Sequence, residues 1–217
     1  MLCPRQLGVG KIRLILCVPL PRARSAKAIS PLQRLDTSLP GVWELRPNVL
    51  RDLRGFFMET YHQAEFAKLG VTDHFVQDNH SCSVKGTLRG LHYQWPHAQA
   101  KLCRVIEGEG LDVAVDIRVG SPNFGKWACV NLSAEKQNQL FIPAGFAHGF
   151  LALTERVQFL YKCSDFYNAQ DEHGILWNDP AIGIDWPIGD PLISEKDAKH
   201  PTLANTPREL LPQYLEK

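Results

Sequence analysis

The feature that most constrains the fold of this sequence is a strict alternation of apolar and polar side chains in its middle. Residues 111–118 read LDVAVDIR, with an apolar residue at every second position and Asp112, Ala114 and Asp116 between them. Because successive side chains of a β-strand point to opposite faces, this spacing predicts a strand with one face on a core. Residues 157–162 alternate in the same way, which predicts a second such strand.

Short apolar runs separated by Gly, Pro and Asn continue over residues 35–186. Many short strands with turn residues between them predict an all-β fold, an antiparallel sandwich or barrel, rather than alternating strands and helices. The sequence Glu-Gly-Glu-Gly at 107–110 lies between the apolar runs 101–106 and 111–118, and predicts a hairpin there.

The chain divides into three expected parts. Residues 1–33 have no sustained hydrophobic period and are rich in Arg, Lys, Pro and Ser, so we expect an unstructured N-terminal extension. The apolar run 14–20 faintly resembles a secretory signal, but the prolines and arginines at 19–24 favour an extension or a start site placed too far upstream. Residues 34–206 are expected to form the β-domain, and residues 207–217 a C-terminal tail. Helices are expected only at 63–69 and 207–215.

Charge and cysteine spacing exclude several classes of protein. The chain has 217 residues with 24 Lys and Arg against 23 Asp and Glu, so it lacks the basic excess of a protein that coats nucleic acids. No apolar run approaches the roughly 18 residues of a membrane-spanning helix. The 6 cysteines show neither C-x-x-C nor C-x-x-H spacing, so no zinc finger or disulfide framework is indicated. We expect a reduced, cytoplasmic protein with no nucleic-acid or membrane partner.

The first candidate site motif is the polar strand 88–94, which reads LRGLHYQ. Alternation predicts that Arg89 and Tyr93 share one face of this strand, while His92 and Gln94 share the other face with Gly90. Since Gly leaves space and polar side chains line it, the second face would suit a pocket inside a barrel. The alternative is a surface histidine on an edge strand.

The second motif lies in FIPAGFAHGF at 141–150, where Pro143, Gly145 and His148 give the spacing P-x-G-x-x-H. This spacing resembles the second half of the cupin barrel signature, in which the histidine is the last ligand of a metal. The first half of that signature is H-x-H followed by Glu, whereas the matching place here reads H-Y-Q at 92–94. A transition metal takes about three or four protein ligands, and only two are present at most. We therefore expect no metal.

Eight motifs, taken in order, resemble the dTDP-4-dehydrorhamnose 3,5-epimerase family. They read RGFFMETY, FVQDNHS, LRGLHYQ, AQAKLCRVIEGEGLDVAVDIRVGSPNFGKW, LSAE, IPAGFAHGF, LYKCSDFY and ILWNDPAIGIDWP. The resemblance covers residues 35–203 and leaves out residues 1–32. It implies a cupin-type jelly roll that assembles as a homodimer and uses no metal or other cofactor.

The family's reaction fits these residue types. The resemblance implies epimerisation of dTDP-4-dehydro-6-deoxy-D-glucose at carbons 3 and 5 to dTDP-4-dehydro-L-rhamnose, a step of dTDP-L-rhamnose biosynthesis. The 4-ketone acidifies the hydrogens on both carbons, so a placed base can remove them if the enolate is stabilised. The resemblance assigns the base to His92, a residue type suited to neutral pH, with Asp197 as its carboxylate partner. Lys101 would neutralise enolate charge, and Tyr161 would return a proton on the opposite ring face.

Further positions match the family's substrate contacts. Arg and Lys suit the pyrophosphate, the first through bidentate contacts and the second as a point charge. Taken alone, Arg54 and Lys101 would be read as solvent-exposed charges, and Phe56, Phe57 and Tyr61 as core aromatics. The matching residues are Arg54, Glu59, Gln77, Asp78, Asn79, Arg89, Lys101, His148, Tyr167, Glu172 and Lys196.

Three alternatives remain open from sequence. A 3- or 5-monoepimerase of another deoxysugar pathway shares the fold and the histidine base, although the presence of both His92 and Tyr161 favours the double epimerase. A metal-dependent cupin oxygenase would carry stoichiometric metal. A non-catalytic sugar-binding cupin would bind the nucleotide sugar without exchanging its hydrogens.

Overall fold

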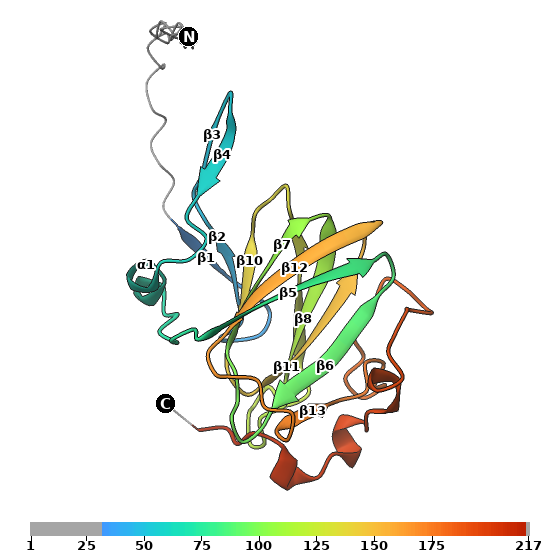
Figure 1. Cartoon of the computed structure of the whole chain (residues 1–217). Coiled ribbons are helices and arrows are strands. Elements are labelled where there is room, and N and C mark those ends of the chain that lie inside the picture. The colour runs from blue at the N-terminus through green and yellow to red at the C-terminus, as the bar shows by residue number, and fades with distance from the viewer. Residues whose placement is uncertain (1–31, 216–217) are drawn as a thin grey trace, which may run out of the picture.

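Two antiparallel sheets face each other in the structure, a computed structural model that describes residues 32–215 (Figure 1). The six-stranded sheet runs in spatial order β1 (Gln33–Asp36), β2 (Trp43–Arg46), β10 (Gln139–Ile142), β7 (Lys101–Glu107), β12 (Arg156–Cys163) and β5 (Gln77–Val84). The five-stranded sheet runs β13 (Glu172–Gly174), β6 (Leu88–Gln94), β11 (Phe146–Ala152), β8 (Glu109–Asp116) and β9 (Trp127–Ser133). The expected all-β class is confirmed.

The core between the sheets is built from side chains of both. Val105 of β7 and Phe159 of β12 belong to one buried cluster with Ala114 of β8 and Phe150 of β11. The rings of Phe150 and Phe159 lie 4.3 Å apart between their centroids. This contact joins the two sheets, and both rings also line the cavity between them.

Both sheets are also covered on their outer faces. The outer face of the five-stranded sheet, including Val113 and Val115, packs against the C-terminal segment through residues such as Trp186 and Leu211. The interpretation of residues 111–118 as a strand with one face on the core was therefore incomplete. Asp112 and Asp116 on its other face are fully buried as well, because that face points between the sheets.

The predicted hairpin at 107–110 is wrong. β7 pairs with β10 and β12, whereas β8 pairs with β11 and β9, so the chain passes from one sheet to the other at this point. Gly108 has a positive φ of 78°, and a Cβ atom there would lie 2.2 Å from the carbonyl oxygen of Arg156. The glycines that resemble a tight turn instead allow a crossing between sheets.

The helical content of the described residues is small. α1 (Gln63–Lys68) agrees with the expected helix. Its side chain Phe66 is buried and packs the helix against the outer face of the six-stranded sheet. The helix expected at 207–215 is wrong, because only the short 3₁₀ helix η3 (Arg208–Leu210) forms there. The tail instead packs against the barrel, with Leu211 buried and the N–H of Tyr214 donated to the carbonyl of Val119.

A two-stranded hairpin, β3 (Val49–Asp52) with β4 (Gly55–Met58), projects away from the two sheets (Figure 1). Its apolar side chains are exposed, with Phe56 at 52% and Phe57 at 71% of their full accessible area. The interpretation of these aromatics as core residues is therefore wrong for a single copy of the chain. A projecting hairpin with this composition has the character of a contact surface.

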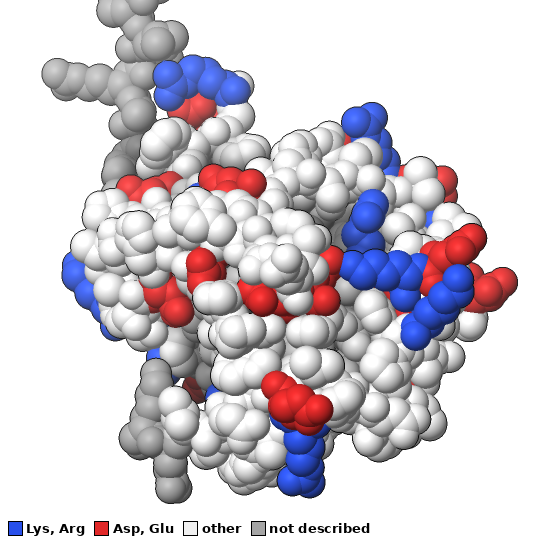
Figure 2. All heavy atoms as spheres, turned by 60° about the horizontal axis from the view of Figure 1, so that its bottom comes forward, with Lys and Arg blue, Asp and Glu red and all other residues white. Residues whose placement is uncertain are grey.

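Two general expectations concern the surface and the chain ends. Acidic and basic side chains lie side by side on the face in Figure 2, and most of that face is uncharged. Within residues 32–215 no helix is long and apolar enough to span a membrane.

Nearly all of the expected N-terminal extension lies outside the described residues, although Gln33 already belongs to β1.

Candidate active site

A cavity of about 450 Å³ opens between the two sheets and beside the C-terminal segment. Side chains from both sheets line it, and so does the short segment that ends in 3₁₀ helix η1 (Asp197–Lys199). The sequence-predicted residues that the structure brings together here are Asn79, Arg89, His92, Lys101, His148, Tyr161, Glu172, Lys196 and Asp197.

An irregularity in β6 directs His92 into the cavity. On β11, His148 pairs with His92 while Phe150 pairs with Arg89, so β6 carries one extra residue between the two pairings. Such a bulge changes which face the following side chains occupy. The predicted face assignment is therefore wrong for Arg89, which lines the cavity with His92, while Tyr93 packs in the outer cluster.

Asp197 holds His92 in a defined orientation. The Nε2 of His92 lies 2.8 Å from Asp197 Oδ1, and the backbone N–H of Gly90 donates to Oδ2 at 3.1 Å. Burial raises the pKa of Asp197, but the hydrogen bond and positive charge of His92 outweigh it and bring the pKa to about 2. An ionised carboxylate only accepts hydrogen bonds, so His92 donates through Nε2–H and keeps its lone pair on Nδ1.

The opposite wall carries Tyr161 and Lys101, from the six-stranded sheet. Burial raises the pKa of Tyr161 to about 12, so this hydroxyl keeps its proton at neutral pH. The Nζ of Lys101 lies 5.9 Å from the centre of the Tyr161 ring. The cavity therefore presents a basic nitrogen on one wall and a protonated hydroxyl with a lysine on the other.

A second histidine–aspartate pair lies deeper in the cavity. His148 Nε2 hydrogen-bonds Asp112 Oδ1, and these residues are diagonal neighbours across β11 and β8. Burial lowers the pKa of His148 more than the nearby Asp112 raises it. Asp112 Oδ2 is buried and has no hydrogen-bond partner among the described residues.

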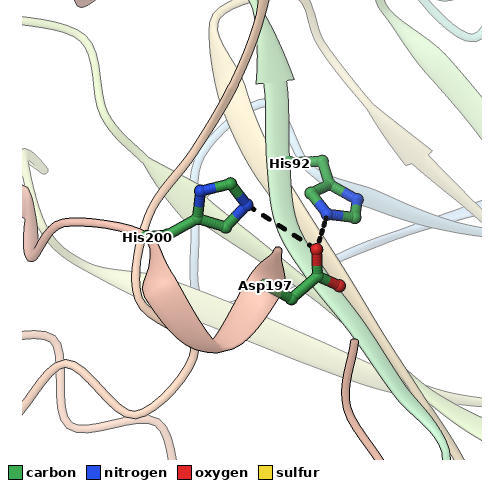
Figure 3. Close-up of side chains that lie close together, drawn as sticks. All are labelled: His92, Asp197 and His200. Atoms are coloured by element: carbon green, nitrogen blue, oxygen red, sulfur yellow. Dashed lines mark hydrogen bonds and ion pairs between the residues drawn. The ribbon is translucent and has the colours of Figure 1, made fainter. Parts of the chain in front are cut away.

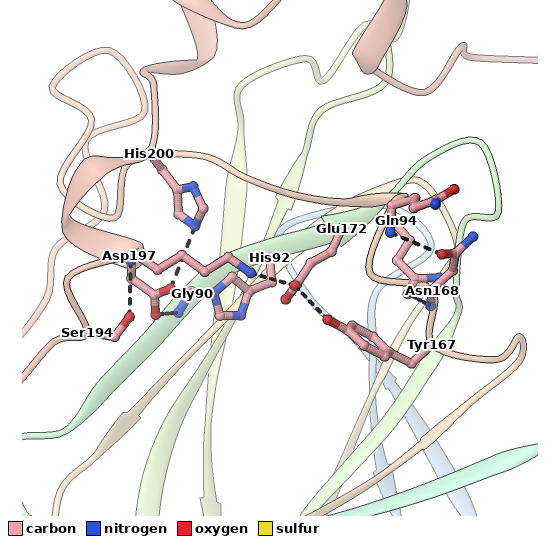
Figure 4. A network of polar contacts seen from close by, with 11 residues as sticks. Gly90, His92, Gln94, Tyr167, Asn168, Glu172, Ser194, Asp197 and His200 are labelled. Atoms are coloured by element: carbon pink, nitrogen blue, oxygen red, sulfur yellow. Dashed lines mark hydrogen bonds and ion pairs between the residues drawn. The ribbon is translucent and has the colours of Figure 1, made fainter.

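A polar network frames the cavity near β13 (Figure 4). Glu172 accepts hydrogen bonds from the Tyr167 hydroxyl and from Lys196. Gln94 was expected to line the pocket with His92. It lines an adjoining space of about 110 Å³, and its side chain also accepts the N–H of Asn168. Gln94 thereby fixes the loop that carries Tyr167.

Gln77 and Asn79 extend this site along β5. Gln77 donates to the Asn79 side chain and accepts the backbone N–H of Tyr167, so it also supports that loop. Arg89 donates to the Ser83 hydroxyl at 3.2 Å, which connects β6 to β5 across the gap between the sheets.

Three predicted contacts lie outside this cavity. Arg54 lies at the tip of the projecting hairpin and pairs with Asp52, and Glu59 is exposed just after β4. Asp78 points to the outer face of the six-stranded sheet, where it pairs with Lys162. Within one copy of the chain, none of the three reaches His92.

Sequence reasoning missed two residues at the site. Asp112 was placed on the polar face of an alternating strand, and only the second sheet makes that face interior. His200 follows Asp197 by three residues, and a 3₁₀ helix places residues at that spacing on the same side. Two groups of residues hold donor atoms within 4.8 Å of one another and could ligate a metal: His92, Asp197 and His200, and Cys103, Asp112 and His148.

His92 and Tyr161 line one cavity from different sheets, an arrangement compatible with an acid–base enzyme of the epimerising kind, because inversion at carbon needs one group on each face. The comparisons with known proteins agree. The chain belongs to the dTDP-4-dehydrorhamnose 3,5-epimerase family, whose model matches residues 36–205.

Relatives and solved structures place the chain well inside this family. It is 54% identical over 165 residues to the dTDP-4-dehydrorhamnose 3,5-epimerase of Shigella flexneri, covering 75% of this chain and 91% of that protein. It is 52% identical over 178 residues to the Neisseria gonorrhoeae enzyme of that name, covering 82% of this chain and 54% of that protein. The crystal structure of the Legionella pneumophila dTDP-6-deoxy-D-glucose-3,5-epimerase in complex with dTDP-4-keto-L-rhamnose is 46% identical, with a TM-score of 0.84 over 86% of this chain and 100% of that one.

Proposed function

We propose that this chain is an isomerase that converts dTDP-4-dehydro-6-deoxy-D-glucose to dTDP-4-dehydro-L-rhamnose by inverting carbons 3 and 5. The observation that carries this proposal is the opposition of His92 and Tyr161, which face one cavity from different sheets. The family membership and the keto-sugar bound by the Legionella relative support the substrate class.

The first step is proton removal by His92. Its Nδ1 lone pair takes the hydrogen from the carbon next to the ketone, and the electron pair of the broken C–H bond moves to the ketone oxygen. Asp197 stabilises the imidazolium that forms, since its carboxylate already accepts the Nε2–H. Lys101 stabilises the enolate oxygen, a preorganised charge of the kind that contributes most to many enzymes.

The second step is proton return by Tyr161. The enolate carbon takes the hydroxyl proton from the face opposite His92, and the ketone re-forms with the carbon inverted. The tyrosinate regains a proton from solvent, and His92 releases one. Carbons 3 and 5 are both bonded to carbon 4, so its ketone activates the hydrogens on both. The same pair of groups therefore serves both inversions.

No cofactor enters this proposal, because the substrate's own ketone accepts the electron pair. Elemental analysis of the active enzyme tests it: activity without stoichiometric metal is expected, and a stoichiometric iron requirement would favour the oxygenase alternative. A cytoplasmic location also stays a prediction. It is supported by the free thiols of the described cysteines, which are Cys82, Cys103, Cys129 and Cys163.

We also propose that the enzyme is a homodimer, in which Arg54 and Glu59 of one copy reach the cavity of the other. The exposed apolar hairpin and the distance of both residues from their own cavity support this arrangement. Mixing two inactive variants tests it. If the site is shared, Arg54→Ala and His92→Ala subunits will restore activity when exchanged, because some mixed dimers contain one intact site.

The reaction itself is tested by incubation with the 4-keto sugar nucleotide in deuterated water, followed by NMR. Deuterium at both carbons 3 and 5 with formation of the inverted product is expected. Deuterium at one carbon would identify a monoepimerase. Binding without any exchange would identify a sugar-binding cupin and contradict the proposal.

A further inference from the structure

We propose that His92, Asp197 and His200 form a zinc-binding site, and that zinc bound there inhibits the enzyme. Figure 3 shows both imidazole rings directed at the same carboxylate. Donor atoms of the three residues all lie within 4.8 Å of one another. Two histidines and one carboxylate are a common ligand set for divalent transition metals.

His200 is placed for this role by its local structure. 3₁₀ helix η1 brings it beside Asp197, with His200 Nε2 at 3.6 Å from Asp197 Oδ1. Gly174 makes room for the ring, because a Cβ atom at that position would lie 2.2 Å from His200 Nε2. Among the described residues this buried nitrogen has no hydrogen-bond partner. An unsatisfied buried nitrogen aimed at a carboxylate is what a cation between them would satisfy.

The spacing of the ligands fits zinc. With Zn–N and Zn–O bonds of about 2.0–2.2 Å, two ligands of a tetrahedral zinc lie about 3.4 Å apart. The separations from Asp197 Oδ1 are 2.8 Å to His92 Nε2 and 3.6 Å to His200 Nε2. Both therefore need to change by well under 1 Å. Asp197 Oδ2 keeps its hydrogen bond from the Gly90 N–H, and such a bond fixes the orientation of a carboxylate that binds a metal.

The charge that attracts a cation here is the Asp197 carboxylate. Lys196, next to Asp197 in the chain, is paired with Glu172, while Arg89 and Lys101 are the other cationic side chains of the cavity. The fourth ligand position faces the cavity, which His92 and Asp197 both line, so a water molecule can occupy it.

Zinc at this site would remove the proposed base. A neutral imidazole carries one proton and one lone pair. When Nε2 of His92 binds zinc through its lone pair, the ring proton resides on Nδ1. Nδ1 then has no lone pair to accept a hydrogen from the substrate, so inhibition follows from a tautomer change without any redox step.

The second group, Cys103, Asp112 and His148, is the competing location for zinc. Its separations are less even, at 2.5 Å from His148 to Asp112 and 3.9 Å from His148 to the Cys103 sulfur. All three residues are buried, and burial raises the pKa of the Cys103 thiol, which must lose its proton to bind a metal. We therefore assign zinc to His92, Asp197 and His200.

Calorimetric titration with zinc chloride and turnover assays over a zinc series test the site. We expect one zinc per chain, inhibition that a chelator reverses, and a cobalt-substituted protein without thiolate charge-transfer absorption. With each turnover expressed relative to the same variant's own zinc-free rate, His200→Ala should raise the half-inhibitory zinc concentration at least about tenfold. His74→Ala, at an exposed histidine in the loop before β5, is the matched control and should leave zinc inhibition unchanged.

The outcomes separate this site from the proposed reaction on which its inhibitory effect rests. Unchanged zinc binding in His200→Ala would overturn the site, and so would loss of binding in Cys103→Ser, which would move the metal to the deeper group. A chain that binds zinc through His200 but does not act on the keto sugar would contradict the proposed function and leave the site standing.

Discussion

The two histidine–aspartate pairs at the cavity, His92 with Asp197 and His148 with Asp112, contain the same residue types, and their histidines lie on neighbouring strands, yet their surroundings differ. His92 and His148 stand directly opposite each other on β6 and β11. The His92 side chain is 29% exposed and that of its partner Asp197 is 7% exposed. The corresponding values are 10% for His148 and 0% for Asp112. The His92–Asp197 pair is accessible from the cavity, and the His148–Asp112 pair, called the sealed pair below, is almost fully buried.

This difference shows that burial and strand register set the accessibility of each histidine, since the residue types are identical. His92 is turned to the cavity by the extra residue in β6, so its free nitrogen can reach a substrate. Burial lowers the pKa of His148, so it is the neutral form that is favoured there. A neutral imidazole held by a buried carboxylate is suited to orienting a substrate, while an accessible one is suited to moving a proton.

The largest effect is expected from removing the accessible histidine. His92→Ala should lower turnover by at least about 10²-fold, the usual contribution of a general base, with little change in melting temperature. Turnover and thermal unfolding measured on one preparation check this. His74→Ala is the control, and a His92→Ala enzyme of normal activity would remove the distinction between the pairs.

The next effect separates proton removal from proton return. Tyr161→Phe deletes the hydroxyl and keeps the ring that packs beside His148 and Phe159. Exchange of substrate hydrogen with deuterated water should continue, while formation of inverted product falls at least about tenfold below it. NMR gives both rates from one sample. If the two rates fall in equal proportion, Tyr161 is a packing residue.

The sealed pair should matter more for stability. Asp112→Asn replaces the charged acceptor of the His148 N–H by a neutral amide oxygen, and a hydrogen bond to a neutral group contributes less than one to a charged group, so we expect a loss of about 1–2 kcal/mol in the free energy of unfolding. Denaturant titration measures it. Asp78→Asn, at an exposed carboxylate paired with Lys162, is the matched control and should change stability by less than about 0.5 kcal/mol. Equal losses in both variants would contradict the contrast in burial.

The smallest effect is the acid dependence of the accessible pair. The pKa of Asp197 is about 2 in the folded chain, below its ordinary value of 3.8. Its ionised form therefore stabilises the fold above about pH 4, and this contribution is lost as the pH falls from 4 towards 2. Above pH 4, the free energy of unfolding of Asp197→Asn should be lower than that of the unaltered chain by at most about 2 kcal/mol. As the pH falls from 4 towards 2, the two free energies should become equal. A difference in the free energy of unfolding that does not change with pH would contradict the lowered pKa of Asp197 beside His92.

Much of this architecture was predictable from local pattern. The alternation at 157–162 correctly predicted a strand with Val157, Phe159 and Tyr161 on its inner face. Motif resemblance brought His92, Lys101, Tyr161 and Asp197 to the site, and the structure places all four in one cavity.

The failures have a common physical reason, which is that pairing is not encoded locally. Gly108 looks like a turn residue whether the next strand folds back or crosses to the other sheet. An alternating pattern does not reveal where a strand contains a bulge, so Arg89 was predicted on the wrong face of β6. The burial of Asp112 depends on a second sheet that its own strand does not specify.

Gly90 carries a consequence for how this enzyme can evolve. Its N–H holds Asp197, and a Cβ atom there would lie 2.6 Å from the carbonyl oxygen of His148. Its φ of 122° also disfavours any other residue. One position thus constrains both pairs at once. In a library selected for any new sugar substrate, codon 90 should stay glycine while the residues around the cavity vary. Substrate specificity can therefore change only through positions that do not support both pairs.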